Sequence, residues 1–494
     1  MSVPQKFRAI GDFHEYYSGA RKAPYTTVFV GGNHEASSHL QELYYGGWVA
    51  PNIYYLGAAN VVRFGGLRIA GMSGIWKGYN YNKPHFERLP YSEDEIKSLY
   101  HVREIDIRKL LLLRTPVDVG VSHDWPRGIE WQGDWKTLFK KKDLFEADAR
   151  AGTLGSSAAR YVLDRVRPRY WFSAHLHCKF AAMVEHDKAE APPVNAGECR
   201  QSEDFGYEDR VSMGLNNDQR IEPTKNADEI DLDLDDEGDL ANPPTATTSA
   251  TAAVASFDQS EYSGISPDIR SQLPASFNRL QSPPRQNQSA PPPPPEITNK
   301  QTQFLALDKC LPNRKFLQIL DVDPLSASTM HSPPRLTYDK EWLAILRIFA
   351  SYDPHQPNPP NLGEAAYRPL IFREEEWVEE NLVKQDRMGI PSNFAITAPV
   401  YDGKAIGSVG REQPKEYSNP QTNVFCDLLG IPNWFDTSEK DREELRGAKT
   451  LKNQSERMNS SGDRGRGRGG GRGWGGRGGG DGRGRGRGRG RGFR

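Results

Sequence analysis

The sequence contains little cysteine and no long apolar run. Its four cysteines show no C-x-x-C spacing, which indicates free thiols in a reducing compartment rather than a disulfide framework. There is no apolar stretch of about eighteen residues, the minimum for a membrane-spanning helix, and no signal-peptide core near the start. We therefore expect a soluble intracellular protein. The cysteines are Cys178, Cys199, Cys310 and Cys426.

Charge is balanced over the 494 residues but unevenly distributed. Lysine and arginine total 64, aspartate and glutamate total 65, and the formal net charge is −1. Residues 228–239 are acidic, whereas residues 464–494 contain eleven arginines that alternate with glycine and are interrupted by Trp474 and Phe493. Arginine neutralises phosphate and stacks on bases. We expect this tail to bind RNA without sequence preference; a flexible solubilising tail is the alternative.

The first 200 residues have the pattern of a mixed α/β domain. Short β-branched or aromatic runs end at polar motifs, which is typical of strands followed by functional loops. A glycine pair, Gly65-Gly66, separates two further runs and predicts a hairpin. The expected strands are Tyr25–Val30, Val61–Phe64, Leu67–Ala70, Val117–Val121 and Tyr170–Phe172, and Ser92–Leu113 has helical spacing.

The remaining sequence divides by composition. Residues 206–300 lack apolar periodicity and predict a disordered linker. Residues 301–440 predict a smaller C-terminal domain, and residues 441–494 predict a disordered Gly/Arg-rich tail. Within the C-terminal domain we expect a strand, a turn and a second strand from Phe304, then helices at Tyr338–Ala350 and Glu374–Val383.

Three polar motifs stand at the ends of expected strands: Gly32-Asn33-His34-Glu35, Ser122-His123-Asp124-Trp125 and Ala174-His175-Leu176-His177. Amide oxygen and neutral imidazole nitrogen are both ligands of first-row divalent metals. Two histidines two residues apart on an extended segment would face one site. The three motifs therefore predict a metal centre. Asp124 and Glu35 are candidates to orient the ligating histidines.

The motifs and their flanks resemble the lariat debranching enzyme family, within the calcineurin-like metallophosphoesterase superfamily. The matching segments cover about residues 1–185, and the likeness extends to residues 304–383. That family hydrolyses the 2′–5′ phosphodiester at the branch point of excised introns. The segments are GGNHEASSHLQELYYGGWVAPNIYYLG, SGIWKGYNYNKPHFERLPYS, VSHDWPRGI, TLGSSAARYVL and YWFSAHLHCKFAA.

The resemblance implies a layered β-sandwich flanked by helices, with residues 1–200 as the catalytic domain. It implies a two-metal site containing iron, zinc or manganese, a branched RNA substrate and a nuclear location. Residues 77–91 would form the lariat-recognition loop. The implied metal ligands are Asn33, His123, His175 and His177, the general acid is His34, and the substrate-binding residues are Lys77, Tyr79, Tyr81, Lys83 and His85.

One part of the family pattern has no counterpart before Asn33. The family opens with a Cys-x-His or Asp-x-His strand and then a Gly-Asp whose aspartate bridges two metals. Gly11-Asp12 is the only similar dipeptide, but Gln5–Ala9 are too polar for the strand that should precede it. We expect an N-terminally incomplete catalytic domain. The alternative function is a catalytically impaired RNA-binding remnant that lacks the bridging aspartate.

Overall fold

The computed structural model describes residues 10–186, 292–325, 333–401 and 415–448. Within Met1–Asp436 the described residues form one compact unit. Residues 437–448 belong to a second unit, in which residues 439–448 are helical. Most of the predicted linker (206–291) and most of the predicted tail (449–494) lie outside the described residues.

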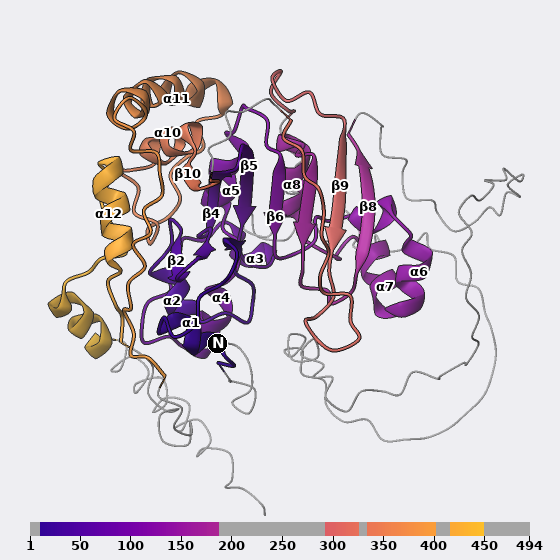
Figure 1. Cartoon of the computed structure of the whole chain (residues 1–494), viewed down its shortest axis with the longest axis horizontal. Helices are drawn as coiled ribbons and strands as arrows, with labels where there is room; N and C mark the ends of the chain where they lie inside the picture. Colours follow the sequence, from indigo (N-terminus) through magenta and orange to yellow (C-terminus); the bar gives the residue numbers. More distant parts are fainter. Residues whose placement is uncertain (1–9, 187–291, 326–332, 402–414, 449–494) are drawn as a thin grey trace, which may run out of the picture. The chain divides into compact units, whose positions relative to one another are not determined.

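A seven-stranded sheet forms the centre of the first unit (Figure 1). Four neighbouring strands, β5, β6, β7 and β9, run parallel, and the other three are antiparallel to their neighbours. The carboxyl ends of the parallel strands therefore meet at one edge. In spatial order the strands are β10 (Leu336–Tyr338), β4 (Ala59–Phe64), β5 (Leu67–Met72), β6 (Val119–Ser122), β7 (Tyr170–Ser173), β9 (Gln301–Ala306) and β8 (Phe180–Glu185).

A three-stranded sheet packs against one face of the larger sheet. It contains β1 (Thr27–Phe29), β3 (Ile53–Tyr55) and β2 (Gly47–Ala50) in that spatial order. Because side chains alternate along a strand, Val61 of β4 joins the main core, whereas Val62 packs with Trp48 and Tyr54 of the smaller sheet. The two facing sheets confirm the predicted layered α/β sandwich.

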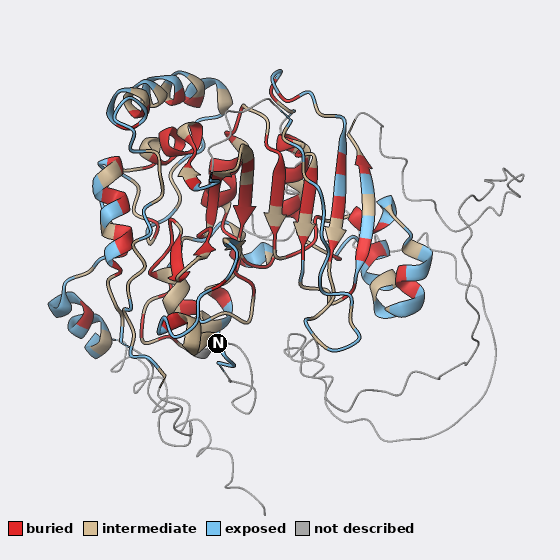
Figure 2. Cartoon of the chain, viewed as in Figure 1, coloured by how far each residue is buried: buried red, intermediate tan, exposed pale blue. Residues whose placement is uncertain are grey.

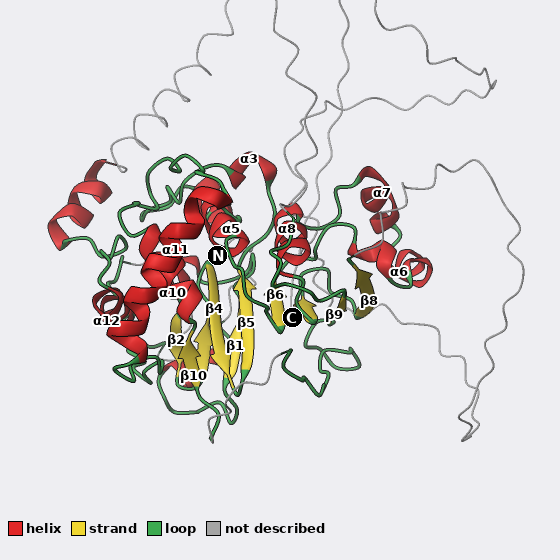
Figure 3. Cartoon of the chain, turned by 90° about the horizontal axis from the view of Figure 1, so that it is seen from above, coloured by secondary structure: helices red, strands yellow, loops and turns green. Residues whose placement is uncertain are grey.

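Helices cover the opposite face of the large sheet, where α5 (Glu104–Leu111) and α8 (Ser157–Val166) pack together (Figure 3). Figure 2 shows that burial is concentrated in the central strands. None of the helices in the described ranges is both long and apolar enough to cross a membrane. The remaining helices are α1 (Phe13–Tyr17), α2 (Ser37–Gln41), α3 (Gly78–Tyr81), α4 (Glu93–Ser98), η2 (Ile129–Gln132), α6 (Trp135–Lys141), α7 (Leu144–Ala151), α10 (Lys340–Ile348), α11 (Glu364–Val378), the π-helical η5 (Glu379–Val383) and α12 (Pro420–Leu429).

The N-terminal predictions are largely confirmed, with one exception. The β4–β5 hairpin turns at Gly65-Gly66, where both φ angles are positive. The single helix predicted over Ser92–Leu113 is wrong, because the segment forms α4 and α5 with an interruption between them. The interruption pairs with a distant segment: Ile75 N–H donates to Tyr100 O at 3.1 Å, and Val102 N–H donates to Ile75 O at 3.0 Å.

The second half of the chain contributes two strands to the seven-stranded sheet. β9 lies between β7 and β8, and β10 pairs with β4, so residues 301–436 belong to one compact unit with residues 10–186. The second strand expected after Phe304 is absent, because both edges of β9 are already occupied; Leu317 and Ile319 are instead 73% and 86% exposed. The helix expected from Glu374 begins earlier, at Glu364.

A buried ion cluster joins the β4–β5 hairpin to α10. Arg68 is 2% exposed, and its guanidinium donates to Asp339 Oδ1 at 2.7 Å and to Glu341 Oε2 at 2.9 Å. Asp339 also caps α10, because its Oδ1 accepts from Trp342 N–H at 3.1 Å. Burial raises the pKa of Asp339, but the charges of Arg68 and Arg63 outweigh burial and hold the pKa below its usual value.

We predict that Asp339→Ala lowers the free energy of unfolding by about 3–5 kcal/mol, because it leaves Arg68 buried without its main partner. Urea unfolding at neutral pH measures this loss. The loss should shrink as the pH falls through the acidic range, because the lowered pKa means that Asp339 stabilises the fold only while ionised. Arg21→Ala breaks exposed ion pairs with Asp12 and Glu15 and serves as the control, because exposed pairs contribute little to stability. Equal losses in the two variants would contradict this account.

Candidate active site

Three of the predicted polar loops leave the sheets at neighbouring positions. β6 ends directly before His123, and β7 ends directly before Ala174. β6 and β7 are adjacent and parallel, so the two loops emerge at the same edge of the sheet. Ala174 N–H donates to His123 O at 3.0 Å, which ties the loops together. The parallel pairing therefore brings the second and third motifs into contact.

The first motif reaches the same place from the smaller sheet. Gly31 follows β1; its N–H donates to Ser73 Oγ at 3.0 Å, and its carbonyl accepts from Gly74 N–H at 2.8 Å. Ser73 follows β5, the strand next to β6. Asn33 Oδ1 then lies 3.2 Å from His123 Nε2. The smaller sheet thus supplies an amide oxygen to the imidazole edge of the larger sheet.

Gly32 leaves the space that His123 occupies. A Cβ at this position would lie 2.3 Å from His123 Cε1, which is far inside van der Waals contact. The imidazole therefore lies directly against the backbone of the first motif. Burial, and then the nearby charges of His175, His34 and His177, lower the pKa of His123 to about 3. At neutral pH its ring is uncharged, the form in which imidazole binds metals.

The backbone of the third motif differs from the expected extended segment. His175 and His177 both have left-handed φ angles, 59° and 52°, and the expectation that two extended residues point the same way is wrong. Such conformations cost about 1–3 kcal/mol each for residues with a Cβ and cluster at functional sites. The His175 ring nevertheless lies beside that of His123, with ring centroids 4.9 Å apart.

Asp124, one of the two carboxylates proposed to orient histidines, lies within electrostatic range of His175. Asp124 is buried and accepts from the backbone N–H groups of Trp76 at 3.2 Å and Trp125 at 2.9 Å. It therefore holds two loops together. Burial raises the pKa of Asp124 and of Glu35, and a backbone hydrogen bond from Gly32 partly offsets the effect at Glu35.

The donors fit a divalent ion by chemical type, and the charge of His177 acts on the His123 ring as that of His175 does. Asn33, His123 and His175 lie together, and Gly32 leaves room for the His123 ring. In the described parts of the chain, no three side chains of His, Cys, Asp or Glu are grouped so as to hold a metal. Within the described residues, Asn33, His123 and His175 are therefore in contact, but no group of three His, Cys, Asp or Glu side chains is formed.

Asp12 pairs with a surface arginine rather than with Asn33, His123 or His175. It precedes α1, and its Oδ2 pairs with Arg21 Nη1 at 2.9 Å; the Asp12 side chain is 67% exposed. Its placement is that of a surface ion-pair partner rather than of a bridging ligand.

The five residues expected to bind substrate are divided by the fold. Tyr79 is 70% exposed, and Lys83 Nζ lies 5.8 Å from the centroid of its ring. Lys77 is half-buried. Tyr81 packs on Trp76 with ring centroids 4.8 Å apart, and His85 Nε2 lies 2.7 Å from Asp106 Oδ2. Tyr81 and His85 therefore pack inside the loop and support it. In this conformation they do not offer a direct contact for RNA.

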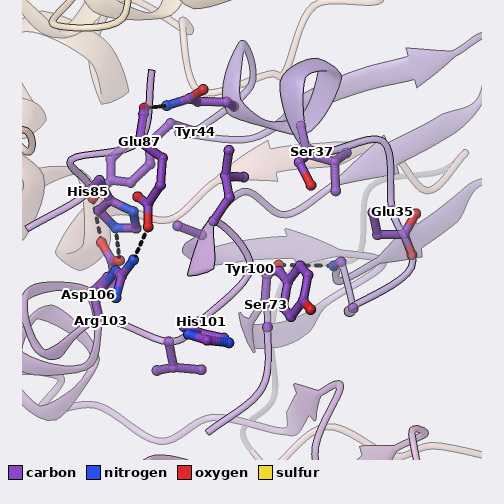
Figure 4. Close-up of a pocket in the computed structure, with 18 of the residues that line it drawn as sticks. Glu35, Ser37, Tyr44, Ser73, His85, Glu87, Tyr100, His101, Arg103 and Asp106 are labelled. Carbon is purple, nitrogen blue, oxygen red and sulfur yellow. Dashed lines mark hydrogen bonds and ion pairs between the residues drawn. The ribbon is translucent and has the colours of Figure 1, made fainter. Parts of the chain in front are cut away.

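A pocket behind the first motif contains charged residues that the sequence did not indicate. Gly31, Gly32 and Glu35 line one side, and Glu87, Arg103 and Asp106 line the other. Figure 4 shows Arg103 paired with Glu87, and His85 paired with Asp106. The sequence did not indicate this pocket, because Arg103 and Asp106 lie in a stretch with the spacing of a surface helix.

Comparison with known proteins shows where this site belongs. Residues 267–434 match the family model described as lariat debranching enzyme, C-terminal domain. A lariat debranching enzyme of Schizosaccharomyces pombe is 39% identical over 433 residues, which cover 87% of this chain and 86% of that protein. The chain belongs to the lariat debranching enzyme family.

Animal members of the lariat debranching enzyme family are also similar. The Gallus gallus enzyme is 36% identical over 94% of this chain and 66% of its own length. The Homo sapiens enzyme is 36% identical over 90% of this chain and 62% of its own length. Membership confirms the resemblance drawn from the motifs. The assignment of individual ligands in this chain stays a prediction.

We predict that Gly32→Ala displaces the His123 ring, because the new Cβ and the imidazole cannot occupy the same space. Once displaced from its buried position, His123 should titrate near the ordinary histidine pKa of about 6.5 instead of far below it. NMR titration of the ring resonances, assigned with His123→Gln, measures the change. Gly78→Ala is the control, since its nearest new contact is 3.8 Å. An unchanged His123 titration in Gly32→Ala would contradict the packing described.

Proposed function

We propose that this chain hydrolyses the 2′–5′ phosphodiester at the branch point of excised intron lariat RNA. The observation that carries the proposal is the contact of Asn33, His123 and His175 at one sheet edge, in a member of the lariat debranching enzyme family. Relatives of that name act on lariats. An amide oxygen beside two imidazoles is suited to phosphodiester chemistry at a metal.

Metal dependence is part of the proposal. Asn33, His123 and His175 would hold a divalent ion, Fe²⁺, Zn²⁺ or Mn²⁺, with His177 as a further ligand of a two-metal site. Such an ion polarises the phosphate and lowers the pKa of a bound water. His34, adjacent to Asn33, would donate a proton to the leaving 2′ oxygen; general acids of this kind contribute roughly 10²–10⁴-fold.

Substrate contacts come from the loop above the site and from the tail. Tyr79 is exposed for base stacking, and Lys77 and Lys83 carry charges suited to phosphate. The Gly/Arg tract, outside the described residues, would hold RNA without sequence preference. The nucleus, where introns are excised, is the proposed location.

A specific observation favours a second function. No three His, Cys, Asp or Glu side chains are grouped as a metal site in the described ranges. Binding of branched RNA with impaired hydrolysis is therefore the alternative. The two proposals differ in one measurable respect, metal-dependent turnover.

We predict that the purified chain linearises a branched RNA when supplied with Fe²⁺, Zn²⁺ or Mn²⁺, and that His34→Ala slows this about 100-fold or more by removing the proton donor. Gel analysis of a synthetic branched RNA measures the rate. His14→Ala, which changes a half-buried histidine on α1, is the matched control and should retain wild-type rates.

The outcomes separate the two functions. Cleavage by the wild type and the control, lost in His34→Ala, supports the enzyme. Retained binding of branched RNA with no cleavage under any of the three metals supports the RNA-binding alternative.

We also predict that deletion of residues 464–494 weakens RNA binding and flattens its salt dependence, because eleven arginines are removed. The turnover number with saturating branched RNA should not change. Fluorescence anisotropy at several salt concentrations measures the affinity and its salt dependence. Steady-state cleavage of branched RNA in excess measures the turnover number. Unaltered affinity would exclude the tail as an RNA-binding segment.

A further inference from the structure

A second group of aromatic and basic side chains lies outside the candidate active site, on η2 and α6. Trp131 at the end of η2 is 37% exposed, and Trp135 at the start of α6 is half-buried. Their ring centroids are 5.6 Å apart. Phe139, one turn along α6, is buried and contacts both indoles, with centroids 5.3 Å and 5.9 Å away. Phe139 thus anchors the group to the core.

Three lysines lie around these rings at the surface of α6. Lys136, Lys140 and Lys141 are exposed, and no carboxylate of the described residues forms an ion pair with them. Lys136 Nζ lies 5.5 Å from the centroid of Trp135. Since Lys136 and Lys140 are four residues apart, they project from the same face of α6. Their charges are available to an external anion.

Nearby acidic groups are occupied within the protein. Asp134 Oδ1 accepts from Thr137 N–H at 3.1 Å and caps α6, and Asp143 caps α7 in the same way. Glu146 pairs with Arg150 at 2.7 Å, and the Arg150 guanidinium lies 5.9 Å from the Trp131 ring. These acids therefore serve helix capping and local pairing. Hydrogen bonds from Thr137, and after them the charges of Lys141 and Lys136, lower the pKa of Asp134.

This group is connected to the active-site loops through β8. Trp125, two residues after His123, stacks on Phe180 at the start of β8, with centroids 5.2 Å apart. Gly133, between η2 and α6, forms a bridge with Ala182 of β8. Figure 1 shows α6 and α7 beside the part of β8 where this antiparallel strand begins and the parallel strands finish, and Figure 2 colours much of their surface as exposed. The same sheet edge therefore carries both features.

We propose that η2 and α6 form a platform for single-stranded RNA, built from Trp131, Trp135, Lys136 and Lys140. Exposed indoles stack on unpaired bases regardless of sequence, and lysines neutralise phosphates. The occupant is the unpaired strand that leads away from the branch. That choice of occupant rests on the proposed function, because only a branched RNA held at the loops continues along this edge.

Binding of RNA is measured first without any chemistry. The full chain in EDTA is titrated into a labelled, unbranched single-stranded RNA of mixed sequence, and fluorescence anisotropy is followed. Trp131→Ala should weaken binding at least about 5-fold, the lower range for loss of one stacked base. Lys136→Gln/Lys140→Gln should reduce the slope of log affinity against log salt by about 1.4, or about 0.7 for each phosphate contact.

The chain offers a matched control for the exposed aromatic. Phe372 on α11 is 50% exposed beneath a cation, with Arg114 Cζ 4.4 Å from its ring centroid. Phe372→Ala should bind RNA as the wild type does. All variants retain the Gly/Arg tail, so its contribution cancels, and circular dichroism melting confirms that each is folded.

The outcomes of the binding experiment are decisive. Losses confined to the platform variants, and larger for single-stranded than for duplex RNA, support the platform. Wild-type affinity in the platform variants, or equal losses for duplex RNA, overturns it. Because neither metal nor cleavage is involved, failure of the proposed hydrolysis leaves this result unaffected.

A kinetic comparison then connects the platform with the branched substrate. Two branched RNAs are used, one with a strand of about ten nucleotides leaving the branch and one with a strand trimmed to one nucleotide. Trp131→Ala should raise KM for the long substrate alone and leave kcat unchanged. An equal rise for both substrates overturns the assignment of the strand to this platform.

Discussion

The parallel pairing of β5, β6 and β7 is the constraint on which the rest of the site depends. Parallel strands finish at the same edge, so His123 and His175, which follow two neighbouring strands, must meet there. β5 belongs to the same parallel set, and the loop after it binds the backbone of Gly31. The amide of Asn33 thereby reaches His123 from a different sheet.

The second half of the chain helps to hold this edge of the sheet in place. β9 adds to the parallel set beside β7, and the cluster of Arg68, Asp339 and Glu341 joins the hairpin before the site to a helix almost three hundred residues later. A buried charge cluster of this kind tolerates little movement, because each lost partner leaves a buried charge. Residues 301–436 therefore contribute to the rigidity of the sheet edge that carries His123 and His175.

Much of this architecture could be predicted from local sequence. Apolar runs that end at polar motifs identified β1, β6 and β7, and parallel topology then implied that their loops meet. What could not be predicted depends on distant contacts. Ile75 divides the helix expected at 92–113, and β7 and β8 already occupy both edges of β9. The left-handed backbone at His175 likewise could not be predicted, because this conformation is uncommon for any residue with a Cβ.

If this edge is a metal centre, Asn33, His123 and His175 hold a divalent ion there. Anomalous diffraction from crystals of the chain grown with Mn²⁺ locates such an ion. We expect an anomalous peak within about 2.0–2.3 Å of Asn33 Oδ1 and of one ring nitrogen each of His123 and His175. A fully formed loop arrangement with no peak among these three side chains, at saturating Mn²⁺, would contradict this expectation.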